Sequence, residues 1–310
     1  MPRSVLRVGT RGSALALAQA EGVRKAISQV ISHRNFELVP ITTRGDQMRG
    51  PLPTIGGKGL FTEDIQEALA TGKIDLAVHS AKDLPAGAPE EIVLAAVPPR
   101  EDPRDALITR HGGGLAKLVP GTTVGTSSLR RSVQLLPMAR GLIPTPIRGN
   151  VDTRLRKLSA GEVQALVVAL AGLRRLGKDG RVAEVLPTTV MLPAPGQGAL
   201  AVECRAGDKD MREALSKIED PLARRAFEAE RAFLLALGGS CNVPLGALAT
   251  LDGNNIRLRG LVGSLDGSRI IRDELTGTDP VAVGEGLADR MIGAGAGEII
   301  AAVTAAASPD

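Results

Sequence analysis

Short apolar runs alternate with segments of helical periodicity through the first two thirds of the chain. Candidate strands lie at residues 5–8, 74–78, 122–125 and 165–169. This alternation predicts parallel sheets covered by helices, as in α/β proteins. Ligands of open α/β sheets bind beyond the carboxyl ends of the strands. The four strand ends here carry hydroxyl groups or cations, so each is a candidate position for binding or chemistry.

The last third of the chain opens with a different signal. Asp220 and Pro221 are typical of a helix start, because Asp is a good N-cap and Pro fits the first helical position. The predicted helix runs to Leu237 and ends at the two glycines that follow it. Its predicted apolar face consists of Leu222, Ala226, Ala229, Phe233 and Leu237.

Three strands and further helices are expected after this helix. The strand patterns lie at 248–251, 256–262 and 270–275, are separated by Asp-Gly turns, and give way to helical patterns from Val281. This order predicts a small α+β domain. Boundaries between domains are expected at 98–105, at 192–199 and before Pro221, where proline interrupts the pattern.

Residues 43–59 show neither helical nor strand periodicity. They contain five glycines and two prolines, and a helical pattern begins at Leu60. A loop of this length in a compact domain is usually functional or disordered. We interpret it as a mobile lid with Lys58 and Phe61 at its hinge.

Charge and aromatic content narrow the class of ligand. The chain has no Trp, no Tyr and only four Phe, which argues against single-stranded nucleic acid, since such binding relies on aromatic stacking. The net charge is +4, yet residues 100–178 hold fourteen Lys and Arg against five Asp and Glu. This region is expected to meet anions.

Several cations stand where a helix dipole disfavours them, at strand ends or helix N-termini. Each one alone would more often be a solvated surface charge, and the shared position favours a ligand. Arg130 and Arg131 follow three hydroxyl residues, 126–128, and this donor set suits a carboxylate or phosphate. The full set is Arg11, Lys82, Arg130, Arg131, Arg148, Arg154, Arg174 and Arg175.

Asp83 follows Ser80 and Lys82 at another strand end. A surface pair with Lys82 and a functional carboxylate are equally good interpretations of this residue alone. Among so many cations the carboxylate would stay ionised, and it would then stabilise a positive transition state or move a proton on a nitrogen-bearing substrate.

The two cysteines form neither a disulfide scaffold nor a metal motif, and a reducing compartment is expected. Cys204 lies in an alternating strand pattern. Cys241 lies in the loop GGSCNVP, past a helix C-terminus, where the dipole does not favour a thiolate. A small apolar filler and an attachment point both remain open for Cys241.

The N-terminal segment resembles a signal peptide only in part. Its apolar stretch at 14–18 is too short for one, and no run approaches the roughly 18 apolar residues of a membrane span. A cytoplasmic protein without membrane contact is predicted.

The motifs of the whole chain closely resemble those of the porphobilinogen deaminase family, also called hydroxymethylbilane synthases. The matching stretches are TRGSALALAQA (10–20), TRGD (43–46), GGKGLF (56–61), DLAVHSAKDLP (75–85), REDPRDA (100–106), VGTSSLRR (124–131), RGNVDTRLRKL (148–158), AGLRRLG (171–177), PGQGA (195–199) and GGSCNVPLGA (238–247).

This resemblance implies a fold. It implies two α/β domains like periplasmic-binding-protein type II domains, with a cleft between them, and a small C-terminal α+β domain. The expected boundaries are 1–98 with 199–217 for the first domain, 103–193 for the second, and 221–310 for the third. PGQGALAVECR would be the return of the chain into the first domain.

The resemblance also implies an activity. Such enzymes join four porphobilinogen molecules head to tail into hydroxymethylbilane and release ammonia at each step. Their primer is a dipyrromethane cofactor held through a thioether, and Cys241 matches the cysteine that holds it. Asp83 matches the catalytic aspartate. No metal, nucleic acid or membrane is implied, and a monomer is expected.

Other residues match binding positions of that family. The arginines that would hold the acetate and propionate groups of the pyrroles are Arg11, Arg130, Arg131, Arg148, Arg154 and Arg175. Further matching positions are Ser13, Lys58, Phe61, Ser80, Lys82, Thr126, Ser127, Ser128, Gly149, Ala169, Gly172 and Gln197. Thr54 departs from the lysine that some members carry in the lid, so it receives no binding role.

Two other classes of function compete with this one. A solute-binding module of the same fold would use the arginines for a polycarboxylate, but it has no use for a cysteine in GGSCNVP. A nucleic-acid-binding protein would explain the sequence pI of about 9.3, but the missing aromatic residues argue against it.

Overall fold

The computed structural model describes the chain with several gaps, and it divides into two compact units. The units are Met1–Glu101 with Ala199–Arg225, and Asp102–Gly198 with Ala226–Asp310. The described residues are 5–32, 34–47, 62–85, 87, 89–138, 141–238 and 243–307. Cys241, Lys58, Phe61 and most of the expected lid therefore lie outside the described residues.

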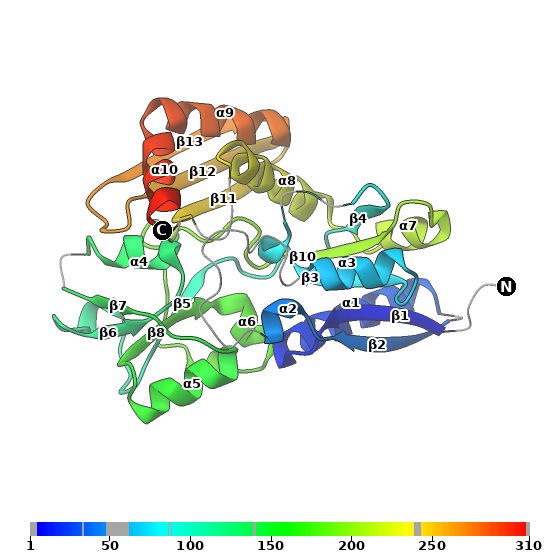
Figure 1. Cartoon of the computed structure of the whole chain (residues 1–310), viewed down its shortest axis with the longest axis horizontal. Helices are drawn as coiled ribbons and strands as arrows, with labels where there is room; N and C mark the ends of the chain where they lie inside the picture. The colour runs from blue at the N-terminus through cyan, green and yellow to red at the C-terminus, as the bar shows by residue number, and fades with distance from the viewer. Residues whose placement is uncertain are drawn as a thin grey trace. The chain divides into compact units, whose positions relative to one another are not determined.

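The first unit is built on a five-stranded sheet of order β2-β1-β3-β10-β4 (Figure 1). β1 pairs in parallel with β2 and β3, whereas β10 pairs antiparallel with β3 and β4. The strands are β1 (Val5–Arg11), β2 (Asn35–Ile41), β3 (Leu76–Ser80), β4 (Ile92–Ala96) and β10 (Leu200–Arg205). The expected parallel pairing is found for β1 with β2 and β3, and the antiparallel strand β10, which enters from residue 198, is an addition to it.

Helices of this unit place polar groups at the strand ends. α1 (Ala14–Val30) starts at Ser13, whose side chain accepts a hydrogen bond from the Ala16 N–H. The other helical segments are α2 (Arg44–Gln47), α3 (Glu63–Ala70), the 3₁₀ turn η1 (Ala81–Asp83) and α7 (Lys209–Ser216). α2 corrects the prediction that residues 43–59 are loop throughout.

Two predicted strands of this unit are shifted in the structure. The first was predicted to end at residue 8 but continues through Gly9 to Arg11. A Cβ on Gly9 would lie 2.2 Å from the Ile74 side chain, so glycine lets this buried residue pack over the strand. Ile74 itself precedes the second strand, which runs from Leu76 to Ser80.

The second unit contains a five-stranded sheet of the same plan, of order β7-β6-β8-β5-β9. β6 pairs in parallel with β7 and β8, and β5 pairs antiparallel with β8 and β9. The strands are β5 (Asp105–Thr109), β6 (Thr123–Gly125), β7 (Ile143–Thr145), β8 (Ala165–Ala169) and β9 (Glu184–Val185). In both sheets the antiparallel strand therefore occupies the fourth position.

Short helices follow the strands of this sheet. They are the 3₁₀ turn η2 (Leu115–Lys117), α4 (Leu129–Leu135), α5 (Val151–Ala160), α6 (Leu170–Arg175) and the 3₁₀ turn η3 (Asp179–Arg181). α4 follows β6 and α6 follows β8, which confirms the predicted alternation of strands and helices in this region.

The C-terminal part is a three-stranded antiparallel sheet with three helices, which confirms the expected α+β pattern. Its elements are α8 (Pro221–Ala236), β11 (Leu245–Asp252), β12 (Asn255–Gly263), β13 (Ile270–Gly277), α9 (Pro280–Gly293) and α10 (Ala296–Ala307). Asp220 caps α8, since its carboxylate accepts hydrogen bonds from the N–H groups of Leu222 and Ala223.

The core of this part surrounds Phe233. Phe233 is fully buried, and a Cβ on Gly260 of β12 would lie 2.7 Å from its ring. Leu222 was predicted on the same buried face, but 56% of it is exposed. It lies in the first turn of α8, whereas the core cluster starts one turn later, at Ala226.

No helix among the described residues is long and apolar enough to cross a membrane.

Phe233 and Leu222 provide a matched pair for testing this core. We expect Phe233→Ala to lower the free energy of unfolding by about 3–5 kcal/mol, because the change leaves a cavity. Leu222→Ala, on the same helix, should change it by less than about 0.5 kcal/mol. Urea unfolding followed by circular dichroism measures both values. Equal losses in the two variants would contradict this assignment of the core.

Candidate functional site

Four predicted site residues of the first unit line one small cavity. Arg11 ends β1, Ser13 caps α1, Ser80 ends β3, and Asp83 ends η1. The cavity that they share has a volume of about 70 Å³. The structure thus brings these residues together at the carboxyl ends of two adjacent parallel strands, as ligand sites in such sheets require.

Gln19 holds Ser80 in place. Its side-chain amide lies within hydrogen-bond distance of the Ser80 hydroxyl, with Nε2 2.9 Å and Oε1 3.2 Å from Oγ. Gln19 is buried on α1 among Ala16, Ala20 and Val23. The sequence prediction missed this residue, although a polar side chain on an apolar helix face is a usable signal.

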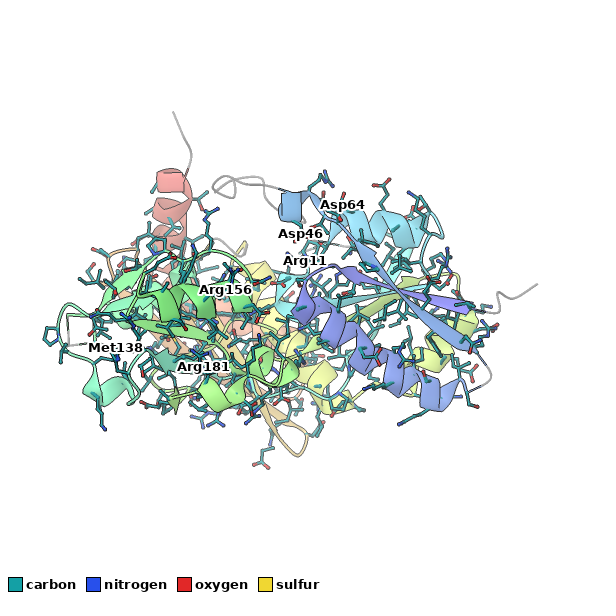
Figure 2. All side chains as sticks on the ribbon, turned by 90° about the horizontal axis from the view of Figure 1, so that it is seen from below. Arg11, Asp46, Asp64, Met138, Arg156 and Arg181 are labelled. Carbon is teal, nitrogen blue, oxygen red and sulfur yellow. The ribbon has the colours of Figure 1, made fainter. Side chains whose placement is uncertain are left out.

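Arg11 has a carboxylate partner within the chain. Its Nη2 lies 2.5 Å from Oδ1 of Asp46, and Figure 2 shows the two side chains together. Burial alone would raise the pKa of Asp46, but hydrogen bonds from Arg11 and Thr43 outweigh burial and lower it. Lys82, the remaining predicted residue of this region, is half-buried in η1 and does not line the cavity.

The arginine pair of the second unit is buried around one aspartate. Arg130 Nη1 lies 2.8 Å from Asp105 Oδ2, and Arg131 donates to Asp105 Oδ1 through Nε and Nη2, at 3.2 and 2.7 Å. Burial alone would raise the pKa of Asp105, but the two guanidinium charges outweigh it and hold the pKa well below its usual range. Asp105 lies within the REDPRDA motif, yet no role was predicted for it.

This ion pair explains two cations in the first turn of α4, where the helix dipole disfavours them. It also gives Arg130 a structural role. Arg130 is 4% exposed, and its Nη1 also donates to the Leu192 carbonyl at 2.6 Å. Its Nε has no hydrogen-bond partner among the described residues. Arg130 therefore ties α4 to the return segment 192–198.

Arg154 is a third cation beside this pair. It is half-buried, its Nε donates to the Gly149 carbonyl at 2.9 Å, and the described residues include no carboxylate partner for it. Burial, with a contribution from the charge of Arg131, lowers the pKa of Arg154 to about 10. Two arginines thus bind a single aspartate, with Arg154 as a third cation beside them, and the excess positive charge suits an anionic ligand.

The hydroxyl residues before α4 shape the adjoining turn. Thr126 Oγ1 accepts from the Ser128 N–H at 3.1 Å, and the Ser127 hydroxyl donates to the Ile147 carbonyl at 2.7 Å. Ser127 also accepts from the Ile147 N–H, so it joins this turn to the loop before α5. The Ser127 hydroxyl, a predicted binding group, therefore also has a structural role through these two hydrogen bonds.

Gly149 lies in that loop at a φ of +106°, and a Cβ there would lie 2.5 Å from the Thr153 side chain. Both features require glycine. Asn150 then caps α5 through the Thr153 N–H. Arg148, the neighbouring predicted residue, is exposed.

The remaining predicted residues surround α6 and the return segment. Ala169 precedes α6, and Gly172 is buried within it. Arg175 donates to the Gly198 carbonyl at 2.7 Å. Gln197 is buried, and its Nε2 donates to the Pro103 carbonyl at 2.7 Å and to Asp105 at 2.9 Å. Arg175 and Gln197 thus hold the segment through which the chain returns to the first unit.

Cys204 lies in a strand, β10, as predicted, and it is buried there. Burial, with a contribution from the charge of Asp208, raises the pKa of its thiol to about 11. Since the thiolate is the reactive form, Cys204 is a poor nucleophile.

Comparisons with known proteins identify the family. Residues 6–213 match the model described as "Porphobilinogen deaminase, dipyromethane cofactor binding domain", and residues 225–293 match its C-terminal domain. A porphobilinogen deaminase of Roseiflexus castenholzii is 47% identical over 96% of this chain and 99% of its own length. That of Syntrophotalea carbinolica is 46% identical over 100% of this chain and 99% of its own.

Solved structures give weaker similarities. The VFT2 domain of BvgS from Bordetella pertussis is 15% identical, covering 70% of this chain and 87% of its own, with a TM-score of 0.40. The periplasmic aliphatic sulphonate binding protein of Escherichia coli is 16% identical, covering 76% and 70%, with a TM-score of 0.40. Scores of this size carry no argument about the present chain. The two family models and the full-length relatives are sufficient: this chain belongs to the porphobilinogen deaminase family.

Proposed function

We propose that this chain joins four porphobilinogen molecules head to tail into hydroxymethylbilane, with release of ammonia at each step, in tetrapyrrole biosynthesis. Family membership supports the reaction. The observation that carries it on the structure is the excess of positive charge where Arg130 and Arg131 share the single carboxylate of Asp105 and Arg154 lies near Arg131. Each porphobilinogen carries an acetate and a propionate, and guanidinium groups bind carboxylates through paired hydrogen bonds.

The proposal includes a dipyrromethane cofactor attached to Cys241 through a thioether. Cys204 cannot serve in its place, because it is buried and its thiol pKa is raised. The donor set of the second unit fits the group: Arg131, Arg154 and Thr126 would hold its carboxylates. Arg148 and Arg175 are further candidates for this role. When bound, the cofactor supplies a free pyrrole α-carbon as the first nucleophile.

Asp83 is the proposed catalytic carboxylate. It shares its cavity with Arg11 and Ser80, and Ser80 is held by Gln19. A carboxylate in this position would accept hydrogen bonds from pyrrole N–H groups and stabilise the positive charge that develops as ammonia leaves. Lys82 and Ser13 would bind the acidic side chains of the substrate from the same strand ends.

The finer organisation is also proposed. We keep the three domains at 1–98 with 199–217, 103–193 and 221–310, together with a cytoplasmic location, a monomeric state and the absence of nucleic-acid partners. The chain passes from one compact unit to the other near residues 101 and 198, close to two of the predicted boundaries. Lys58, Phe61 and the lid around them keep their predicted role at the substrate.

Intact-mass measurement tests the cofactor. Protein purified from a host that makes porphobilinogen should carry an adduct of two linked pyrrole units. Cys241→Ser should lose the adduct, because the serine has no sulfur atom to form the thioether. Cys204→Ser should keep it. An unmodified wild-type chain would contradict the proposed function and favour a solute-binding module of the same fold.

Asp83→Asn separates catalysis from cofactor attachment. The variant keeps the size of the side chain but loses the negative charge, so turnover should fall by about 10²-fold or more. The adduct should persist, since Cys241 is unchanged. Porphobilinogen consumption and intact mass are measured on the same sample. Turnover near the wild-type value would exclude the catalytic role.

Arg154 and Arg156 lie two residues apart on α5 and form a second matched pair. Arg154→Met should weaken binding of porphobilinogen roughly 10- to 100-fold, the value of a charge-assisted hydrogen bond. Arg156 is exposed and donates only to Thr153 among the described residues, so Arg156→Met should leave binding unchanged. Figure 2 labels this control residue. Steady-state kinetics gives both values, and equal effects would mean that Arg154 acts only through general charge.

A further inference from the structure

Three polar side chains are buried together where α3, β3 and β10 meet. Gln66, His79 and Glu203 are 4%, 5% and 2% exposed. Gln66 Nε2 lies 3.0 and 3.1 Å from the two carboxylate oxygens of Glu203, and His79 Nε2 lies 3.1 Å from Oε2. Residue 203 pairs with 77 and residue 201 with 79 across the two strands, so Glu203 and His79 extend from the same face of the sheet.

Glu203 has neither an Arg nor a Lys partner among the described residues. A buried carboxylate is stable only when its oxygens receive hydrogen bonds. Gln66 supplies one amide group, and the His79 ring is the other neighbour within reach. His79 Nε2 is at contact distance but out of alignment, and it has no hydrogen bond. The last torsion of a Glu side chain is soft, so a small turn of the carboxylate aligns it with an Nε2–H donor.

This contact bears on which ring nitrogen carries the proton. With Glu203 ionised, a proton on Nε2 makes this contact attractive, and a neutral ring in that tautomer has a lone pair on Nδ1. His79 lines the same cavity as Asp83. Nε2 is the nitrogen buried against Glu203, and we infer that the opposite edge of the ring, with Nδ1, lies toward the cavity.

We propose that Glu203 is a positioning residue that fixes the tautomer of His79, so that Nδ1 is a hydrogen-bond acceptor in the Asp83 cavity. The ligand of this acceptor is an N–H group of the pyrrole substrate, so this inference rests on the proposed function. Asp83 and His79 then form two acceptors, one charged and one neutral, for the N–H groups of a pyrrole. A ring in the other tautomer would present a donor and repel the same groups.

Nitrogen NMR of the wild-type protein tests the tautomer directly. Long-range ¹H–¹⁵N spectra distinguish protonated from unprotonated ring nitrogens, and the chain has only three histidines to assign. The spectrum of His79→Gln identifies the His79 signals. We expect the proton on Nε2 at the pH of the activity assay. A proton on Nδ1 in the wild type would overturn the proposal, whatever the variants show.

Glu203→Gln tests the consequence for the reaction. The amide is isosteric and can donate to Nε2, so the tautomer should switch to Nδ1–H. Because Asp83 remains, kcat should fall roughly 10- to 100-fold, toward the lower end of acid–base effects. The KM and the cofactor adduct should stay unchanged. A variant with the switched tautomer and a wild-type kcat would also overturn the proposal.

Gln66→Met is the matched control. It removes the amide that binds Glu203 but keeps the carboxylate, so the tautomer and kcat should match the wild type while the melting temperature falls. If Glu203→Gln and Gln66→Met lowered kcat by the same factor, the cluster would have only a structural role and the proposal would fail. Absence of adduct and turnover in the wild type would instead refute the proposed function, and the NMR result would still decide the tautomer.

Discussion

The arrangement of the second unit depends on the buried carboxylate of Asp105. It accepts hydrogen bonds from Arg130, Arg131 and Gln197, which come from α4 and from the return segment. Removal of one partner from a buried ion pair is strongly destabilising, because the other charge is left without compensation. The start of β5, the first turn of α4 and the segment that leads into β10 are therefore held by one side chain.

The same interaction determines which cations are left to bind a ligand. Asp105 and the Leu192 carbonyl occupy Nη1 of Arg130, whose side chain is almost fully enclosed. Arg154 lies beside the pair without a carboxylate of its own among the described residues, and its pKa is lowered. A polycarboxylate such as a chain of pyrroles would supply the missing negative charge. The cluster thus contains one arginine enclosed in internal contacts, Arg130, and one without a carboxylate partner among the described residues, Arg154.

The strand ends of the first unit carry a different combination of charged and hydrogen-bonding groups. Arg11 is paired with Asp46, while Asp83 lies in a small cavity with hydroxyl groups and the His79 ring. Cations dominate the candidate site of the second unit, whereas acceptors for N–H groups gather in the first. The proposed substrate, a pyrrole with two acidic side chains, carries groups of both kinds.

Local pattern alone was enough to predict much of this protein. The strand 165–169, the start of α8 at Pro221 and the three C-terminal strands follow from periodicity and capping. The motifs were sufficient to recognise the family. These features depend on neighbouring residues, whose geometry is set by backbone preferences and by the repeat of the helix or strand.

The tertiary structure decided which residues that lie far apart in the sequence come into contact. Asp105 and Arg130 are separated by 25 residues, Gln19 and Ser80 by 61, and Gln66 and Glu203 by 137. The antiparallel entry of β5 and β10 and the exposure of Leu222 were likewise not predicted. Burial and pairing of a polar side chain depend on strand order and on which helix covers it, and no local pattern contains that information. The sequence therefore determined the elements and the family, and the fold determined the partners of each charge.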